Sequence, residues 1–249
     1  MSRARKITFG IGGAVALVVV AMAIYLFFIR EDAPPELVLG ETRTTEAPVT
    51  TTDPTVTEPD PTVTETVPVE TVPAGVEGAW AADPLSVAGY RVVENFRGVP
   101  DFEAVGRTTT PITGSMTITG TVISDASFTV DVAGIESPES LRDGQFRQVM
   151  STDEFPTATF ELRSPIELGE VPANAEPITV TVVGDLTLRG VTLPVTFDMT
   201  AQLNNQKIET LAQIPIVFSE FGIDTPSAPG ITVNDNGLLE ASIIFQRPQ

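Results

Sequence analysis

Apolar and polar residues follow three different patterns along this chain of 249 residues. An uncharged, mostly apolar run covers 7–29, a Thr/Pro/Glu-rich stretch covers 30–78, and alternation of apolar and polar residues dominates 79–249. Only the last segment has the patterned apolar residues that a packed core needs, and it is long enough for one domain. The pattern therefore predicts one folded domain, residues 79–249, preceded by an apolar segment and a spacer.

The apolar run Ile7–Ile29 is long enough to be a transmembrane helix, because its 23 residues at about 1.5 Å rise cross a hydrocarbon core of roughly 30 Å. Basic side chains in residues 1–6 precede it, so the positive-inside rule places that end in the cytoplasm and everything after Arg30 outside the cell membrane. A cleaved signal peptide is the alternative, since Ala21-Met22-Ala23 has the small-x-small pattern of a cleavage site. That triplet lies inside the apolar run, which favours an uncleaved, single-pass anchor.

Threonine, proline, valine and acidic residues make up most of 41–73. Scattered prolines block helices and central strands, and like charges repel, so residues 30–78 are predicted to be an extended, disordered spacer. At ~3.1 Å per residue such a spacer reaches on the order of 140 Å. The density of Thr and Pro also permits O-glycosylation, which the sequence leaves open.

Alternation with a period of two residues predicts an all-β domain. Strands are expected at Met116–Val122, Phe128–Val132, Ile178–Arg189 and Val195–Leu203, and near Val87–Val93, Ala158–Arg163, Glu209–Phe218 and Leu238–Phe245. Turns are expected at Ser124-Asp125, Arg189-Gly190, Asn204-Asn205 and Asp235-Asn236-Gly237. About eight antiparallel strands of even spacing favour a closed barrel or a sandwich.

One short helix is predicted at Ser137–Met150. Ser137 suits the N-cap position and Pro138 suits the first helical position. The later residues Leu141, Phe146, Val149 and Met150 give this helix a partly apolar face.

Charge and composition exclude several functions. The net charge is −19, and the segment 79–249 has 22 acidic against nine basic groups, which disfavours nucleic acid as a partner. The chain has no Cys and no His, so disulfides, a Ser-His-Asp triad and most zinc sites are ruled out. Neither a Gly-rich phosphate loop nor a cluster of metal-ligand residues is evident. We therefore predict no catalytic residue, metal or cofactor, and no enzyme.

Several motifs in the domain resemble those of the YceI-like family. They run from Trp80 to Phe245 and include Trp80-x-x-Asp83-Pro84, Ser127-Phe128, Arg142-Asp143, Phe155-Pro156 with Phe160, Gly184-Asp185-Leu186-Thr187 with Pro194 to Phe197, and Phe221-Gly222-Ile223. The resemblance implies a lipocalin-like barrel that binds polyisoprenoids and related long-chain lipids. This chain departs from the family pattern where many relatives have His, since Leu85, Ser86 and Gln145 stand at those places. Any family role of those His groups therefore does not carry over.

Apolar residues of the predicted strands are the candidates for a lipid-binding interior. They are Met116, Ile118, Phe128, Val130, Phe160, Leu162, Val182, Leu186, Phe197, Met199, Phe218, Ile243 and Phe245. The alternative is that the same side chains simply fill a solid core. Arg142 and Asp143 are candidates either for the mouth of the barrel or for a structural pair that holds the helix.

Two functions follow from these alternatives. A hollow barrel would make this a membrane-anchored, extracytoplasmic protein whose partner is a long-chain lipid or isoprenoid, including quinone-like cargo. A filled barrel would make it a non-enzymatic interaction module of the cell envelope. The volume of any internal cavity distinguishes the two.

Overall fold

The computed structural model describes residues 33–43, 75–96, 101–228 and 231–248. The predicted membrane helix Ile7–Ile29 and most of the predicted spacer lie outside these ranges. In the ranges that are described, no helix has both the length and the apolar character needed to cross a bilayer.

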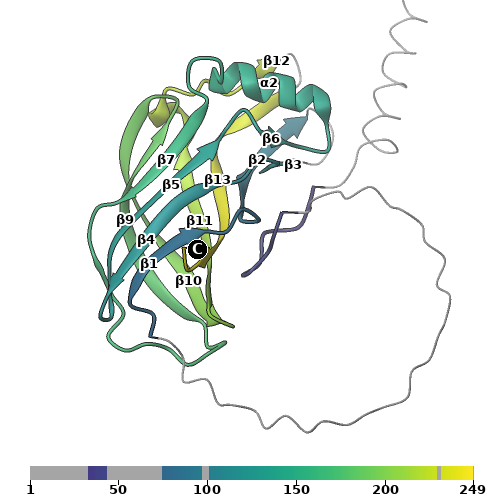
Figure 1. The fold of residues 1–249 in the computed structure, drawn as a ribbon. Helices are drawn as coiled ribbons and strands as arrows, with labels where there is room; N and C mark the ends of the chain where they lie inside the picture. The colour runs from purple at the N-terminus through teal and green to yellow at the C-terminus, as the bar shows by residue number, and fades with distance from the viewer. Residues whose placement is uncertain (1–32, 44–74, 97–100, 229–230, 249) are drawn as a thin grey trace, which may run out of the picture. The chain divides into compact units, whose positions relative to one another are not determined.

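Eight antiparallel strands close into a barrel (Figure 1). Each strand pairs with the next, and β13 returns to β1 through the pairs Ala81 with Gln246 and Ala82 with Phe245. The predicted all-β barrel with one short helix is thereby confirmed. In order around the ring, the strands are β1 (Gly78–Ala82), β4 (Thr113–Thr119), β5 (Val122–Asp131), β7 (Thr157–Leu162), β9 (Ile178–Leu188), β10 (Val191–Asn204), β11 (Lys207–Val217) and β13 (Ile231–Gln246).

A second branch of the sheet leaves the ring at β13. The same edge of β13 that pairs with β1 also pairs with β2 (Val87–Phe96), which continues into β3 (Phe102–Thr108) and β6 (Ile135–Glu136). The barrel is therefore closed by β1 and β4 at one end, while β2, β3 and β6 extend the sheet at the other. The helix α2 (Ser140–Met150) follows β6 and lies at this second end (Figure 1).

Three short elements complete the described fold. Strand β8 (Ile166–Glu167) pairs with β5, and β12 (Ser227–Ala228) pairs with β13. A short 3-10 helix, η2 (Phe218–Phe221), follows β11.

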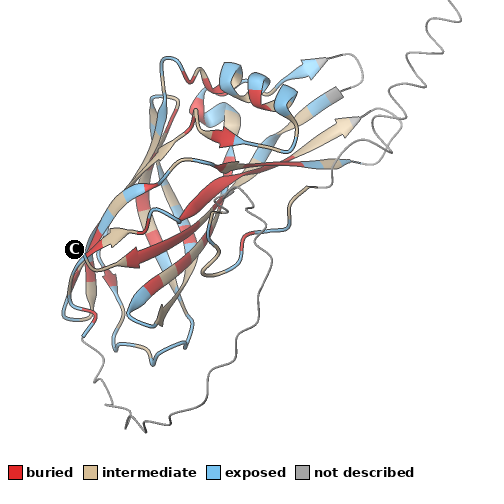
Figure 2. Cartoon of the chain, turned by 45° about the vertical axis from the view of Figure 1, so that its right-hand side comes forward, coloured by how far each residue is buried: buried red, intermediate tan, exposed pale blue. Residues whose placement is uncertain are grey.

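Burial alternates along the strands as the sequence pattern predicts. In β11 the residues Ile208, Thr210, Ala212, Ile214 and Ile216 are buried, while the residues between them are more exposed. The same alternation appears as bands of different colour along the strands in Figure 2. Because successive side chains of a strand point to opposite faces, one face of each strand forms the interior of the barrel.

Two of the predicted turns are confirmed and two are wrong. Arg189-Gly190 and Asn205 adopt positive φ between paired strands. Ser124-Asp125 instead lies within β5, because the chain reverses earlier at Gly120, where φ is +62°. Asp235-Asn236-Gly237 lies within β13, where the register to β2 shifts between Val233 and Gly237, as in a β-bulge.

The helix begins later than the sequence predicts. Its N-cap is Glu139, without a side-chain capping bond, and Ser137 lies before it. The Ser137 hydroxyl and backbone N–H both donate to Asp143 Oδ1, at 2.7 and 2.9 Å. Ser137 therefore ties the preceding turn to the helix instead of capping its first residue.

Part of the predicted spacer is folded against the barrel. Leu37 is only 3% exposed, and Glu41 forms an ion pair with Arg107 of β3. Val76 is also buried, and Gly78 already begins β1. For these residues the structure differs from the extended spacer expected, because contacts with distant strands outweigh the local composition.

Candidate functional site

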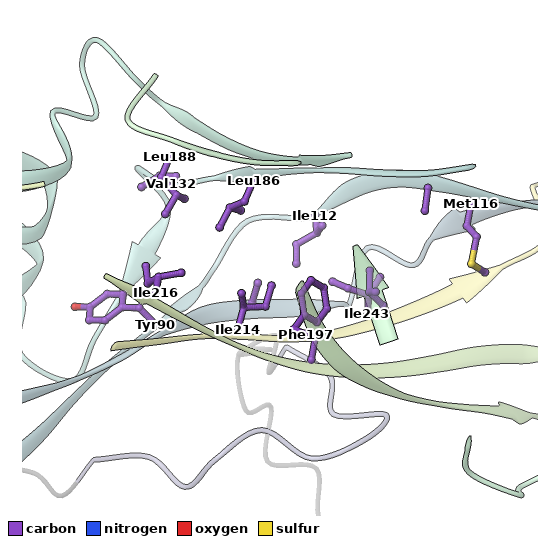
Figure 3. Close-up of a cluster of buried hydrophobic side chains, with 14 of the residues drawn as sticks. Tyr90, Ile112, Met116, Val132, Leu186, Leu188, Phe197, Ile214, Ile216 and Ile243 are labelled. Carbon is purple, nitrogen blue, oxygen red and sulfur yellow. The ribbon is translucent and has the colours of Figure 1, made fainter. Parts of the chain in front are cut away.

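The barrel encloses a cavity of about 270 Å³. Side chains of seven ring strands and of β2 line it, and α2 contributes one end. Figure 3 shows Tyr90, Val132 and Ile216 toward one end of this interior and Met116 toward the other. The lining is apolar almost throughout, with few polar side chains.

Twelve of the thirteen predicted interior residues line this cavity. Ile118 is the exception, since it is buried in the core cluster without lining the cavity. The structure thus brings together residues from β4, β5, β7, β9, β10, β13 and η2, which are up to 129 positions apart in the sequence between Met116 and Phe245. Their role in binding a ligand remains a prediction.

Aromatic rings form a connected row within the lining. The Phe128 centroid lies 6.2 Å from that of Phe160 and 5.5 Å from that of Phe245, and Phe160 lies 5.8 Å from Phe197. The register explains the first pair, because Phe128 and Phe160 are direct partners across β5 and β7. A Cβ at Gly184 would approach the Phe160 ring to 2.3 Å, so this position accepts only glycine unless the ring moves.

A second aromatic pair lies at the α2 end. The rings of Tyr90 and Phe146 are stacked with centroids 4.8 Å apart and planes at 10°. Burial raises the pKa of Tyr90 well above its ordinary value of 10, and the charge of Arg142 offsets this only in part. The Tyr90 hydroxyl is therefore neutral at physiological pH.

Arg142 contributes the charged part of this end. Its Nε donates to Glu94 Oε1 at 3.1 Å, and both side chains are about 15% exposed or less. The guanidinium also lies 5.7 Å from the centre of the Phe102 ring. Arg142 and Glu94 line the cavity together, so opposite charges stand side by side at this end.

Asp143 has a different position from Arg142. It does not line the cavity, and it accepts the two hydrogen bonds from Ser137 described above. The sequence left open whether these two neighbours lie at the mouth of the barrel or form a structural pair. In the structure, Arg142 lies at the cavity, whereas Asp143 holds the start of the helix.

Several lining residues were not predicted as interior residues of the barrel. They come from β2 and β11, which were predicted only as strands, and from α2, for which only an apolar face was predicted; they are Ala88, Tyr90, Val92, Ala212, Ile214, Ile216, Phe146, Val149 and Met150. The period-two pattern of Ala88, Tyr90 and Val92 is the signal that identifies the first group. Glu94 continues that pattern, but its partner Arg142 is 48 residues away and only the fold brings them together.

Residues that carry the family resemblance stabilise the barrel. Trp80 Nε1 donates to the Val76 carbonyl at 2.7 Å, and the Arg247 guanidinium lies 4.1 Å from the Trp80 ring centre. Asp83 accepts from Lys207 Nζ at 2.8 Å and from the Leu85 N–H at 2.9 Å. The Trp80 contacts tie β1 to Val76 before it and to Arg247 after β13, and the Asp83 contacts fix the break between β1 and β2.

No group of three or more acidic, His or Cys side chains suited to a metal ion occurs within the ranges that the structure describes. The described site can enclose an apolar ligand. At its α2 end it also has the neutral Tyr90 hydroxyl and the ion pair between Arg142 and Glu94.

Fold and cavity together define a lipocalin-like, antiparallel barrel with an apolar interior. The family model described as "YceI-like domain" matches residues 80–245. The chain therefore belongs to the YceI-like family.

The solved structures that resemble this chain have low sequence identity to it. A polyisoprenoid binding domain from Saccharophagus degradans, implicated in plant cell wall breakdown, is 14% identical with a TM-score of 0.53; the match covers 69% of this chain and 100% of that one. BcnA from Burkholderia cenocepacia is 20% identical with a TM-score of 0.48, covering 63% and 95%. The YCEI protein of Campylobacter jejuni is 15% identical with a TM-score of 0.45, covering 63% and 85%. The sequence matches no curated protein.

Proposed function

We propose that this protein binds a long-chain isoprenoid or acyl lipid inside its barrel and holds it outside the cell membrane. The observation that carries this proposal is the cavity of about 270 Å³ with its apolar lining. Apolar cavities of about 150 Å³ already admit a benzene molecule, and small-molecule sites begin at roughly 300 Å³. A filled barrel acting only as an interaction module needs no such space.

The chemistry of the lining favours a lipid over a polar solute. Taking a C16-sized chain out of a bilayer forfeits about 0.8 kcal/mol per CH₂, or roughly 12 kcal/mol, which only an enclosing apolar surface offsets. The row of rings from Phe128 to Phe197 supplies such a surface. The structural neighbour from Saccharophagus degradans is itself described as a polyisoprenoid binding domain, which supports the same ligand class.

Membrane attachment through Ile7–Ile29 is the second part of the proposal. Its support is the length of this uncharged run and the basic residues that precede it. Mass spectrometry of the mature N-terminus tests it: the anchored form keeps residues 1–23, whereas a mature chain that starts near Ile24 would contradict the anchor.

Lipid analysis of the full chain tests the cavity. The chain is reconstituted in nanodiscs of one synthetic phospholipid, extracted with organic solvent and analysed by mass spectrometry. We expect a long-chain isoprenoid or acyl lipid other than that phospholipid, at about one per chain. Repeated extracts without such a lipid would contradict the proposal.

A matched pair of variants locates the bound lipid. Ala212→Phe adds a ring to the inner face of β11, where Ala212 lines the cavity, and Ala241→Phe does so on β13. Each is expected to lower the extracted lipid at least about tenfold, equivalent to about 1.4 kcal/mol. Ala79→Phe makes the same change at an exposed position of β1 and should leave the lipid in place.

A further inference from the structure

The outer face of the barrel contains buried residues that the cavity does not explain. In β13, Leu239, Ala241 and Ile243 line the cavity, so the side chains between them alternate to the outer face. Glu240 also borders the cavity, but its carboxylate pairs with Arg91, which does not border it, and Ser242 does not border it at all. Glu240 and Ser242 are nevertheless 1% and 0% exposed. Residues on the outer face of a barrel ordinarily meet solvent, so another part of the chain must cover this one.

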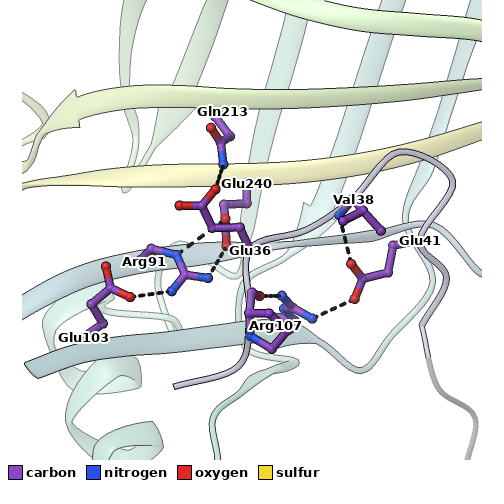
Figure 4. Close-up of polar contacts among 9 residues, drawn as sticks. Glu36, Val38, Glu41, Arg91, Glu103, Arg107, Gln213 and Glu240 are labelled. Atoms are coloured by element: carbon purple, nitrogen blue, oxygen red, sulfur yellow. Dashed lines mark hydrogen bonds and ion pairs between the residues drawn. The ribbon is translucent and has the colours of Figure 1, made fainter. Parts of the chain in front are cut away.

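The covering part is Pro35–Arg43, which we call the docked segment. Figure 4 shows it crossing the outer face of the sheet beside Arg107 and Glu240. Leu37 is its apolar anchor, since it is 3% exposed whereas its neighbour Val38 is 61% exposed.

Polar contacts fix the docked segment to four parts of the barrel. Arg107 Nη1 of β3 donates to Glu41 Oε1 at 2.8 Å, and the Ser242 hydroxyl of β13 donates to the Glu41 carbonyl at 3.1 Å. Gln213 of β11 donates to Glu36 Oε2 at 3.2 Å. The Arg43 N–H donates to the carbonyl of Leu85, between β1 and β2, at 2.7 Å.

The shape of the docked segment depends on a tight turn. The Glu41 N–H donates to the Val38 carbonyl at 3.1 Å, and Gly40 has a φ of +75°, as the third residue of a type II turn requires. A Cβ at Gly40 would lie 2.8 Å from the carboxyl group of Glu209 on β11. The turn and the barrel surface therefore fit each other with glycine at this position.

We propose that the outer face of β11, β13, β2 and β3 is a docking surface for the chain's own segment Pro35–Arg43, and that docking sets how far the barrel stands from the membrane. The second half rests on the proposed membrane attachment. With the segment docked, the few residues between Ile29 and Glu36 allow a separation of roughly 25 Å at most. With the segment released, about 48 residues connect Ile29 to β1, which permits on the order of 150 Å.

One buried apolar side chain, a partly exposed ion pair with Arg107 22% and Glu41 27% exposed, and the hydrogen bonds described above hold the docked segment. They are opposed by the conformational freedom of its nine residues. Docked and released forms therefore interconvert, and salt favours release by screening the ion pair. The connecting residues 44–74 join the docked segment to the same barrel, which raises its local concentration and favours docking within one chain over docking to a second copy.

Distance measurements in the full chain test the docking. Because the chain has no Cys, spin labels are attached at Thr42→Cys in the docked segment and Val217→Cys on β11, both exposed positions. In nanodiscs we expect one narrow distance distribution for the otherwise unchanged chain. Leu37→Asp should replace most of it with a broad, longer distribution, and Val38→Asp should not. A narrow distribution that survives Leu37→Asp would overturn the docking.

Energy transfer tests the second half of the proposal. A donor at Val217→Cys and acceptors in the nanodisc lipid should give efficient transfer, which falls at least about twofold with Leu37→Asp and stays unchanged with Val38→Asp. Equal transfer in all three forms would overturn control of the distance. A chain that keeps the narrow spin-label distance but does not enter nanodiscs would refute the membrane attachment while the docking stands. A narrow distance between two singly labelled chains would show docking to a second copy and overturn docking within the chain.

Discussion

The two faces of strand β13 have opposite chemistry and opposite neighbours. Its inner face presents Leu239, Ala241 and Ile243 to a cavity, with apolar groups on all sides. Its outer face presents Glu240 and Ser242, which are more deeply buried than Leu239 and Ala241 and lie among charged and hydrogen-bonding partners. Burial alone therefore does not distinguish a ligand site from an intrachain contact.

The two faces differ in the contacts that their side chains make. On the outer face, the Glu240 carboxylate and the Ser242 hydroxyl each have a defined protein partner, and a segment of the same chain covers them. On the inner face, side chains that need no hydrogen bond surround a space of about 270 Å³. An apolar cavity selects its ligand mainly by size and shape, whereas the polar face selects one partner by its hydrogen bonds.

The largest effect is expected from breaking the charge pair on the outer face. Glu240 lies 3.5 Å from Arg91, and both side chains are almost fully buried. Glu240→Ala should lower the free energy of unfolding by about 3–5 kcal/mol, because it removes one partner of a buried pair. Urea unfolding followed by circular dichroism measures this.

Glu103→Ala is the control for that variant. Glu103 is closer to Arg91, at 2.8 Å, but its side chain is 53% exposed. Removing it should cost less than about 1 kcal/mol. Equal costs for the two variants would show that burial does not decide the strength of these pairs.

A smaller loss is expected on the inner face. Leu239→Ala should lower the free energy of unfolding by about 2 kcal/mol, at the low end for such a truncation, because this side chain already borders a cavity. The same urea experiment measures it. A loss larger than that of Glu240→Ala would reverse the order of the two faces.

Alkaline pH should affect the inner face through Tyr90. Its pKa is raised by burial, so the folded state holds the phenol proton more tightly than the unfolded state does. Stability is therefore complete below about pH 10, and it falls by up to roughly 1.4 kcal/mol per pH unit as the pH rises above that value. Thermal unfolding at pH 9 to 11 should show this loss, and Tyr90→Phe should remove much of it. An identical loss in Tyr90→Phe would assign it to other groups.

The smallest effect concerns Asp83 between β1 and β2. Burial alone would raise its pKa, but the hydrogen bond and charge of Lys207 and the Leu85 N–H more than offset this, so the pKa lies below its usual value. A lowered pKa means stability that is present above about pH 4 and is lost as the pH falls through the folded-state pKa. Since Lys207 is 46% exposed, the loss should stay below about 1 kcal/mol.

Asp83→Asn tests that assignment. The variant should have lower stability than the unchanged chain at pH 7 and nearly the same stability at pH 2, as measured by thermal unfolding. A difference that is the same at both pH values would mean that the Asp83 charge does not contribute.

Much of the barrel and its interior could be predicted from the sequence. The alternation in 178–188 and 195–203 predicts strands with one apolar face, and the structure pairs these two strands residue by residue. An apolar residue at every second position must face an interior, so twelve of the thirteen candidates could be placed there without knowing the topology. Ile118 follows the same alternation, but whether a core residue borders a cavity depends on its neighbours in space.

Other features depended on contacts between distant segments. Asp235-Asn236-Gly237 has the composition of a turn, but pairing with β11 on one side and β2 on the other keeps it inside β13. Composition likewise predicted a spacer for Glu36 to Arg43, where Arg107 and Ser242 hold the chain on the barrel. Local propensity is weak compared with such tertiary contacts.

By itself, the sequence determined that this chain has an all-β domain with an apolar interior and no His or Cys chemistry, because periodicity and composition are local properties. The tertiary structure alone decided that the barrel is hollow, that Arg142 meets Glu94 at one end of the cavity, and that Pro35–Arg43 covers the outer face. Each of these depends on the distance between residues far apart in the chain, and such distances are set only when the strands close around their ring.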